Sequence, residues 1–197
     1  MLRFSLCGTK IAVSIWFAAF IAVMLLNKNA HICGLSLIFM LSHELAHVIA
    51  MMGFKSRPKK IEFMLGRIKI TAASETISDG ARAVILLAGP ALNLMLFYIL
   101  VKSDRAAAEI NRALFLLNML PAGFLDGGQL SSLFFHRFFC KETAECINNA
   151  ITALICAAML GLGLFLLVNG RRSPSLLVAA IYISASSIKN IRYTKAF

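Results

Sequence analysis

Two histidines and a glutamate stand at a spacing that could carry out metal-dependent hydrolysis. They are His43, Glu44 and His47, in the pattern His-Glu-x-x-His. On a helix, positions i and i+4 share a face, so both histidines can reach one metal ion. Glu44 follows the first histidine directly and can contact a water held by that metal as its general base. These residues therefore predict a hydrolytic metal centre.

The pattern lies inside a long apolar run. Between Asn29 and Phe54, Glu44 is the only formally charged residue. A carboxylate inside a bilayer is energetically expensive and by default marks a functional site. The 197 residues are 59% hydrophobic, and their mean hydropathy of +0.80 lies outside the usual range for soluble domains. We therefore expect an all-α polytopic membrane protein, with residues 1–197 forming a single membrane-embedded domain.

The net charge of +11 is the one feature that could indicate a nucleic-acid partner. The basic residues, however, stand mainly between apolar segments. That placement fits anionic lipid headgroups and lysine-rich and arginine-rich cytoplasmic loops better. We expect a lipid bilayer as partner and no nucleic acid. The five cysteines are scattered without a Cys-x-x-Cys pair, which argues against a disulfide framework.

About six transmembrane helices are predicted, since about 20 mostly apolar residues cross a bilayer. The segments are residues 11–26, 30–53, 83–101, 113–135, 146–170 and 173–188. Asn118 and Pro121 interrupt the fourth, so a helix that breaks near its end is expected there. Loops on the side of the termini hold about twice as many lysines and arginines as the opposite loops. This predicts a multi-pass protein of the cell membrane with cytoplasmic termini.

The segment that follows the second predicted span has a different pattern. Apolar side chains alternate with other residues in two runs, Ile61, Phe63 and Leu65, then Ile68 and Ile70. A period of two on either side of an interruption predicts a small β-hairpin. The alternative is a surface loop whose residues happen to alternate.

A third metal ligand is needed, because hydrolytic zinc sites take three protein ligands and leave one position for water. Of the nine acidic residues, only Glu44 and Asp126 interrupt otherwise apolar stretches. Asp126 must be neutralised or paired there, and a divalent cation does this well. The alternative is an ordinary turn aspartate in Asp-Gly-Gly. His31 and His136 are further candidate donors, but both stand near span ends, where histidines are usually interfacial.

Three short motifs carry a resemblance to a known family. They are His43-Glu44-Leu45-Ala46-His47, Gly89-Pro90-x-x-Asn93 and Asn118-x-x-Pro121-x-x-x-Leu125-Asp126-Gly127-Gly128. Together they resemble the site-2 protease family of intramembrane zinc metalloproteases, over a catalytic core of roughly residues 30–130. The layout is similar to the sporulation-type branch, which processes a membrane-associated sigma-factor precursor. Many members of that branch add a nucleotide-sensing CBS domain, which this sequence lacks.

The resemblance implies a role for each matching residue. One zinc ion per chain would be bound by His43, His47 and Asp126, with Glu44 as the catalytic general base. Asn118 and Asn93 are implied as substrate-binding residues. Asn118 would hold the substrate backbone or polarise its carbonyl, and Asn93 would support the site from the neighbouring helix. The hairpin would correspond to the family's small membrane-associated β-hairpin, where an unwound substrate could add a strand.

The expected function is that of a metalloendopeptidase, a hydrolase that cleaves a peptide bond in or near a transmembrane segment of a membrane-protein substrate. A regulatory precursor is one candidate substrate, and a regulatory membrane partner would fit such a protease. The alternative is a non-catalytic polytopic metal-binding or metal-transport protein, because transporters also place His, Asp and Glu in broken helices. Glu44 separates the two, since a transport site has no need of a carboxylate beside its first ligand. A proteolytically inactive relative is disfavoured because every motif position is present.

Overall fold

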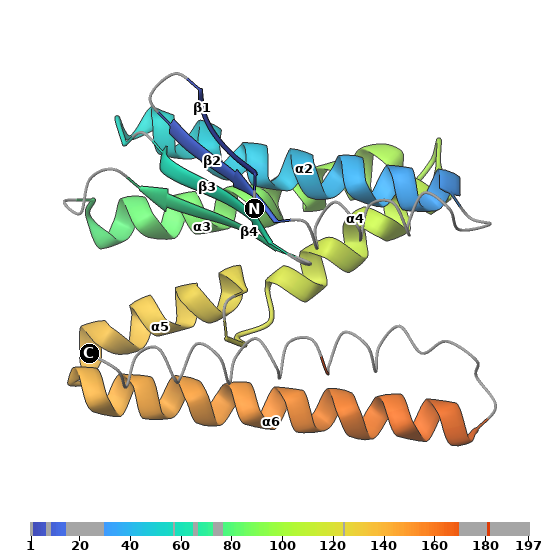
Figure 1. Ribbon diagram of the computed structural model, residues 1–197. Coiled ribbons are helices and arrows are strands. Elements are labelled where there is room, and N and C mark those ends of the chain that lie inside the picture. The colour runs from blue at the N-terminus through green and yellow to red at the C-terminus, as the bar shows by residue number, and fades with distance from the viewer. Residues whose placement is uncertain are drawn as a thin grey trace. The chain divides into compact units, whose positions relative to one another are not determined.

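The computed structural model describes residues 2–6, 9–14, 30–56, 58–64, 67–72, 77–123, 125–169 and 181 of the chain (Figure 1). It divides into two compact units, Met1–Leu116 and Leu117–Phe197, here the N-terminal and C-terminal units. Three of the described helices are long and apolar enough to cross a membrane. They are α2 (Ala30–Gly53), α3 (Asp79–Leu100) and α6 (Lys141–Val168). The protein is a mostly helical membrane protein, as its hydropathy predicts.

Helices α2 and α3 pack along each other in the N-terminal unit (Figure 1). On α2 the buried residues are His43, His47 and Met51, which recur every fourth position and so form one stripe. Most other large apolar side chains of α2 are exposed, as on a helix that faces lipid. Helix α3 starts at a Ser78 cap, whose hydroxyl accepts a hydrogen bond from the Ala81 N–H at 3.3 Å.

A four-stranded sheet completes the N-terminal unit. Its strands lie in the order β1 (Leu2–Leu6), β2 (Thr9–Val13), β3 (Pro58–Met64) and β4 (Arg67–Ala72). The outer pairs are antiparallel and the central pair, β2 with β3, is parallel. A parallel pair needs a long crossover connection, and α2 lies within it. The alternating segment after α2 thus folds as β3 and β4.

The first predicted span requires a correction at its start. Ile11 and Val13 belong to β2, where they pair with Ile61 and Phe63 of β3. A short apolar run rich in β-branched residues is compatible with a strand as well as with a helix. Here the pairing with β3 makes it a strand. Residues 15–29, which make up the rest of that predicted span, lie outside the described residues. So does the sixth predicted span apart from residue 181.

The fourth predicted stretch is divided between two helices. Helix α4 (Arg105–Asn118) ends at Asn118, where the sequence predicts an interruption. Helix α5 (Asp126–Phe138) begins eight residues later, after the loop that contains Pro121. Proline lacks the N–H that would continue a helix, which favours a break at this loop. In the C-terminal unit, α6 runs back along α5 (Figure 1). Ala122, Leu125 and Cys156 form a buried apolar cluster among the described residues of this unit.

Candidate metal centre

His43 and His47 lie one turn apart on α2, and both side chains are buried. Their Nε2 atoms are 3.1 Å apart. Two nitrogens that each lie about 2.0–2.1 Å from one tetrahedral zinc ion are roughly 3.3 Å from each other. The histidine pair therefore fits two ligands of a single ion.

The outer nitrogens of both rings contact helix α3. The Nδ1 atom of His47 lies 2.7 Å from the backbone oxygen of Ile85. A carbonyl oxygen can only accept, so His47 Nδ1 carries the proton and its Nε2 presents a lone pair. The Nδ1 atom of His43 lies 3.0 Å from the side-chain amide nitrogen of Asn93, which is fully buried. The ring of His47 is thus held in the way that metal-binding histidines generally are, with its outer N–H donated to an acceptor, and Asn93 contacts His43 at the equivalent atom.

Gly89 of α3 leaves no room for a side chain beside the two histidine rings. A Cβ at this position would lie 2.5 Å from His47 Nε2 and 2.6 Å from His43 Nε2. Real Cβ atoms do not approach other atoms so closely, so no larger residue fits without displacing the rings. This contact explains why the Gly-Pro-x-x-Asn motif begins with glycine.

Asp126 is half-buried at the first residue of α5, and the glycines after it pack against the preceding loop. A Cβ at Gly127 would collide with the backbone oxygen of Met119. A Cβ at Gly128 would lie 2.6 Å from the backbone oxygen of Gly123, which itself has a positive φ of 53°. The Asp-Gly-Gly sequence is therefore required for the first turn of α5 to lie against its own loop.

Thr152 of α6 is hydrogen-bonded to the loop that precedes α5. Its hydroxyl oxygen accepts a hydrogen bond from the Gly123 N–H at 2.9 Å, and the hydroxyl donates to the Asn148 backbone oxygen at 2.8 Å. One turn earlier on α6, the Asn148 side-chain oxygen accepts from Ser131 of α5 at 2.8 Å. These bonds connect α6 to both the loop and the helix that carry Asp126.

Replacing Thr152 with valine should destabilise the C-terminal unit. Valine has nearly the same shape but leaves the Gly123 N–H without its acceptor, which costs about 1–3 kcal/mol. The free energy of unfolding would be measured by detergent titration followed by circular dichroism. Thr143→Val, on an exposed position of the same helix, is the control and should change stability by less than about 0.5 kcal/mol. Equal losses in the two variants would contradict the assigned role.

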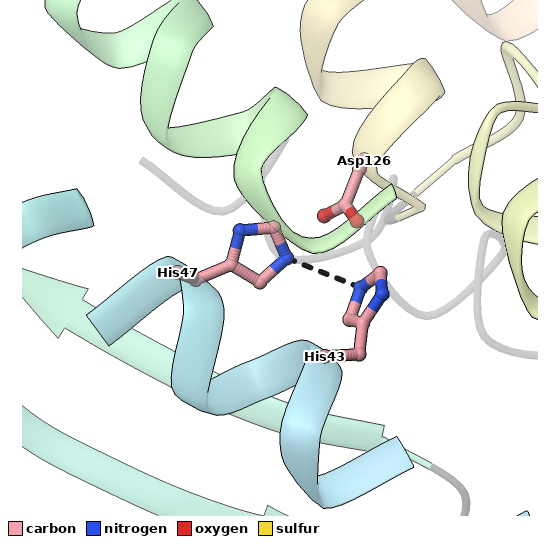
Figure 2. Close-up of side chains that lie close together, drawn as sticks. All are labelled: His43, His47 and Asp126. Atoms are coloured by element: carbon pink, nitrogen blue, oxygen red, sulfur yellow. Dashed lines mark hydrogen bonds between the residues drawn. The ribbon is translucent and has the colours of Figure 1, made fainter. Parts of the chain in front are cut away.

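One ligand atom from each of His43, His47 and Asp126 lies within 4.8 Å of the others (Figure 2). Two imidazoles and a carboxylate form a donor set that suits zinc. The other sequence candidates, His31 and His136, are exposed and outside this group.

The remaining predicted residues lie on the helices that the motifs imply. Glu44 is half-buried on α2 and directly follows His43. Asn118 is half-buried at the last residue of α4. The contacts of Ile85 and Thr152 were not anticipated from the sequence. A backbone carbonyl has no residue type that could reveal it, and a threonine in an apolar helix usually bonds to its own helix.

Comparison with known proteins bears on the fold. No family model matches the chain, and no curated protein matches it. Among solved structures, the chain is similar to the "Site-2 Protease from Methanocaldococcus jannaschii", with a TM-score of 0.70 and 19% sequence identity. The similarity covers 95% of this chain and 94% of that one. The chain thus shares the fold of a site-2 protease, and the resemblance carried by its three motifs is confirmed at the level of the fold.

Proposed function

We propose that this protein is an intramembrane zinc endopeptidase that cleaves a membrane-bound protein in or near a transmembrane segment. The observation that carries the proposal is the buried histidine pair, with Nε2 atoms 3.1 Å apart and both Nδ1 atoms bonded to α3. Such a pair, followed directly by a glutamate in an apolar helix, is what a hydrolytic metal centre requires. The site-2 protease fold supports the same reaction.

His43, His47 and Asp126 are the proposed ligands of one zinc ion. Bound there, zinc would polarise the scissile carbonyl and lower the pKa of a water toward neutrality. Glu44 accepts the proton of the attacking water and then delivers it to the leaving amine. Asn118 donates a side-chain N–H to the substrate carbonyl, where negative charge develops as the water adds.

The proposed substrate enters as an unwound segment. A helix hides its carbonyl groups in internal hydrogen bonds, so the scissile region must lose helical structure before Glu44 can act on a water beside it. Residues of weak helix propensity favour this unwinding. An edge of the four-stranded sheet supplies main-chain partners for the unwound segment. A regulatory precursor tethered to the cell membrane fits this requirement, with six spans and cytoplasmic termini as the proposed topology.

Removal of the metal is the direct test. Purified protein in lipid should contain about one zinc per chain and cleave tagged membrane segments that carry helix-weak residues. Dialysis against a chelator should abolish cleavage, and zinc alone should restore it, because the water then regains its activation. The measurements are metal content by mass spectrometry and cleavage by gel. Cleavage that survives complete removal of the metal would overturn the proposed mechanism.

A further inference from the structure

Asn93 is a buried polar side chain directly behind one of the proposed ligands. It is 0% exposed, and its amide nitrogen lies 3.0 Å from His43 Nδ1. Its side-chain oxygen is among the few buried polar atoms of the described residues that have no hydrogen-bond partner. A buried oxygen without a donor is costly, so its position calls for an explanation.

The hydrogen bond at His43 Nδ1 decides whether His43 can bind a metal. A neutral imidazole carries one proton, and the other nitrogen supplies the lone pair. If Asn93 donates to Nδ1, the proton of His43 lies on Nε2, which then donates to His47 Nε2 at 3.1 Å. If Asn93 presents its oxygen, Nδ1–H donates to that oxygen and Nε2 keeps its lone pair. Only the second arrangement makes His43 a ligand.

Rotation of the Asn93 amide by half a turn interconverts the two arrangements. The rotation exchanges oxygen and nitrogen, which are nearly the same size, and leaves the rest of the side chain in place. The oxygen then accepts from His43 Nδ1–H. The second ring already has this arrangement, because the Ile85 carbonyl behind His47 can only accept.

We propose that Asn93 is a positioning residue of the metal centre, whose amide oxygen accepts the His43 Nδ1–H when the metal is bound. This bond fixes both the tautomer and the direction of the ring. The inference rests on the proposed zinc site. It adds that Asn93 holds His43 in the tautomer whose Nε2 can bind the metal. It also argues against a substrate-binding role for Asn93, since a side chain that is 0% exposed cannot reach a substrate.

The test compares zinc affinity in three variants of the full chain in lipid, measured by competition with a chromophoric chelator and without substrate. Asn93→Leu and Asn93→Ala remove the acceptor and should weaken zinc binding about 10–100-fold. Asn93→Asp keeps an acceptor of the same shape and should restore affinity to near the wild-type value. Asn149→Leu, at an exposed position of α6, is the control and should leave affinity unchanged.

Several results would overturn the inference. Wild-type zinc affinity in both apolar variants would show that His43 needs no acceptor at Asn93. An aspartate variant as weak as the leucine variant would show that Asn93 acts by packing. A raised KM with unchanged zinc affinity would assign Asn93 to substrate instead.

Failure of the proposed function is distinguishable from failure of this inference. A wild-type chain that binds no zinc would overturn both, whereas unaffected Asn93 variants beside an active zinc-loaded wild type would overturn the inference alone. If the apolar variants do not fold, histidine-labelled wild type provides the second measurement. The hydrogen-bonded protons on His43 Nδ1 and His47 Nδ1 should then give two downfield NMR resonances in the zinc-loaded protein, and a single resonance, that of His47, would contradict the proposal.

Discussion

Replacing Glu44 with glutamine is expected to stop cleavage while leaving the metal bound. Glutamine has the same shape as glutamate but cannot take a proton from the attacking water. Loss of a positioned general base typically lowers a rate about 10²–10⁴-fold. Glu44 is not one of the proposed ligands, so zinc content should remain that of the wild type. The measurements are kcat on a tagged membrane segment and zinc per chain.

Glu142→Gln is the matched control for this experiment, because Glu142 is exposed in the first turn of α6 and belongs to none of the three motifs. It should cleave like the wild type. A Glu44→Gln variant that also cleaves like the wild type would exclude Glu44 as the base. If wild type and variant instead carried zinc across a sealed vesicle equally well without cleaving any substrate, the transport alternative would replace the protease.

Helix α2 illustrates what sequence reasoning can predict here. The predicted span and the observed helix both cover residues 30–53, since a mostly apolar run of 24 residues is too long for a single strand and Gly53 ends it. The break between α4 and α5 was predicted at Asn118 and Pro121, since proline lacks the N–H that a continuing helix needs, although the structure also keeps Pro90 inside the continuous helix α3. The i and i+4 relation of His43 and His47 follows from helix geometry alone, so their proximity needed no tertiary information.

Strands β1 and β2 show where such reasoning stops. Residues 11–13 are apolar, and the first and last of them are β-branched. They form a strand by pairing with β3, which lies about fifty residues further along the chain. Hydropathy reports burial in an apolar environment but does not report pairing. The contacts at Ile85, Thr152 and Gly89 are of the same kind. Each depends on how two helices, or a helix and a loop, approach each other, and residue type alone does not encode that approach.

The glycines of the motifs nevertheless acquire a common explanation. Gly89 lets α3 approach the histidine rings, and Gly127 and Gly128 let α5 approach its own loop. In each case the absent side chain brings a backbone segment close to a proposed ligand. The motifs therefore encode the packing of the metal centre as well as its chemistry, and a change at these glycines should affect metal binding without altering any ligand.

Replacing Gly89 with alanine is expected to destroy the metal centre through this packing. The added methyl would lie 2.5 Å from His47 Nε2 and 2.6 Å from His43 Nε2, which are the two atoms proposed to bind zinc. Zinc affinity should fall by about 100-fold or more, beyond the usual cost of losing an outer hydrogen bond to a ligand. Cleavage should be lost with the metal. Chelator competition would measure the affinity, and gel assays the cleavage.

Gly80→Ala separates this effect from a general effect on the helix. Gly80 lies on the same helix, and a Cβ there would meet no atom within 4 Å. Alanine favours helix over glycine by up to about 1 kcal/mol, so this variant should be as stable as the wild type or more so, with unchanged zinc affinity. At Gly89 the same helix preference is opposed by overpacking, which typically costs about 1–3 kcal/mol. Tight zinc binding in Gly89→Ala would mean that α2 and α3 can separate at the metal centre, and that α3 does not orient the histidines in the way argued from Ile85 and Asn93.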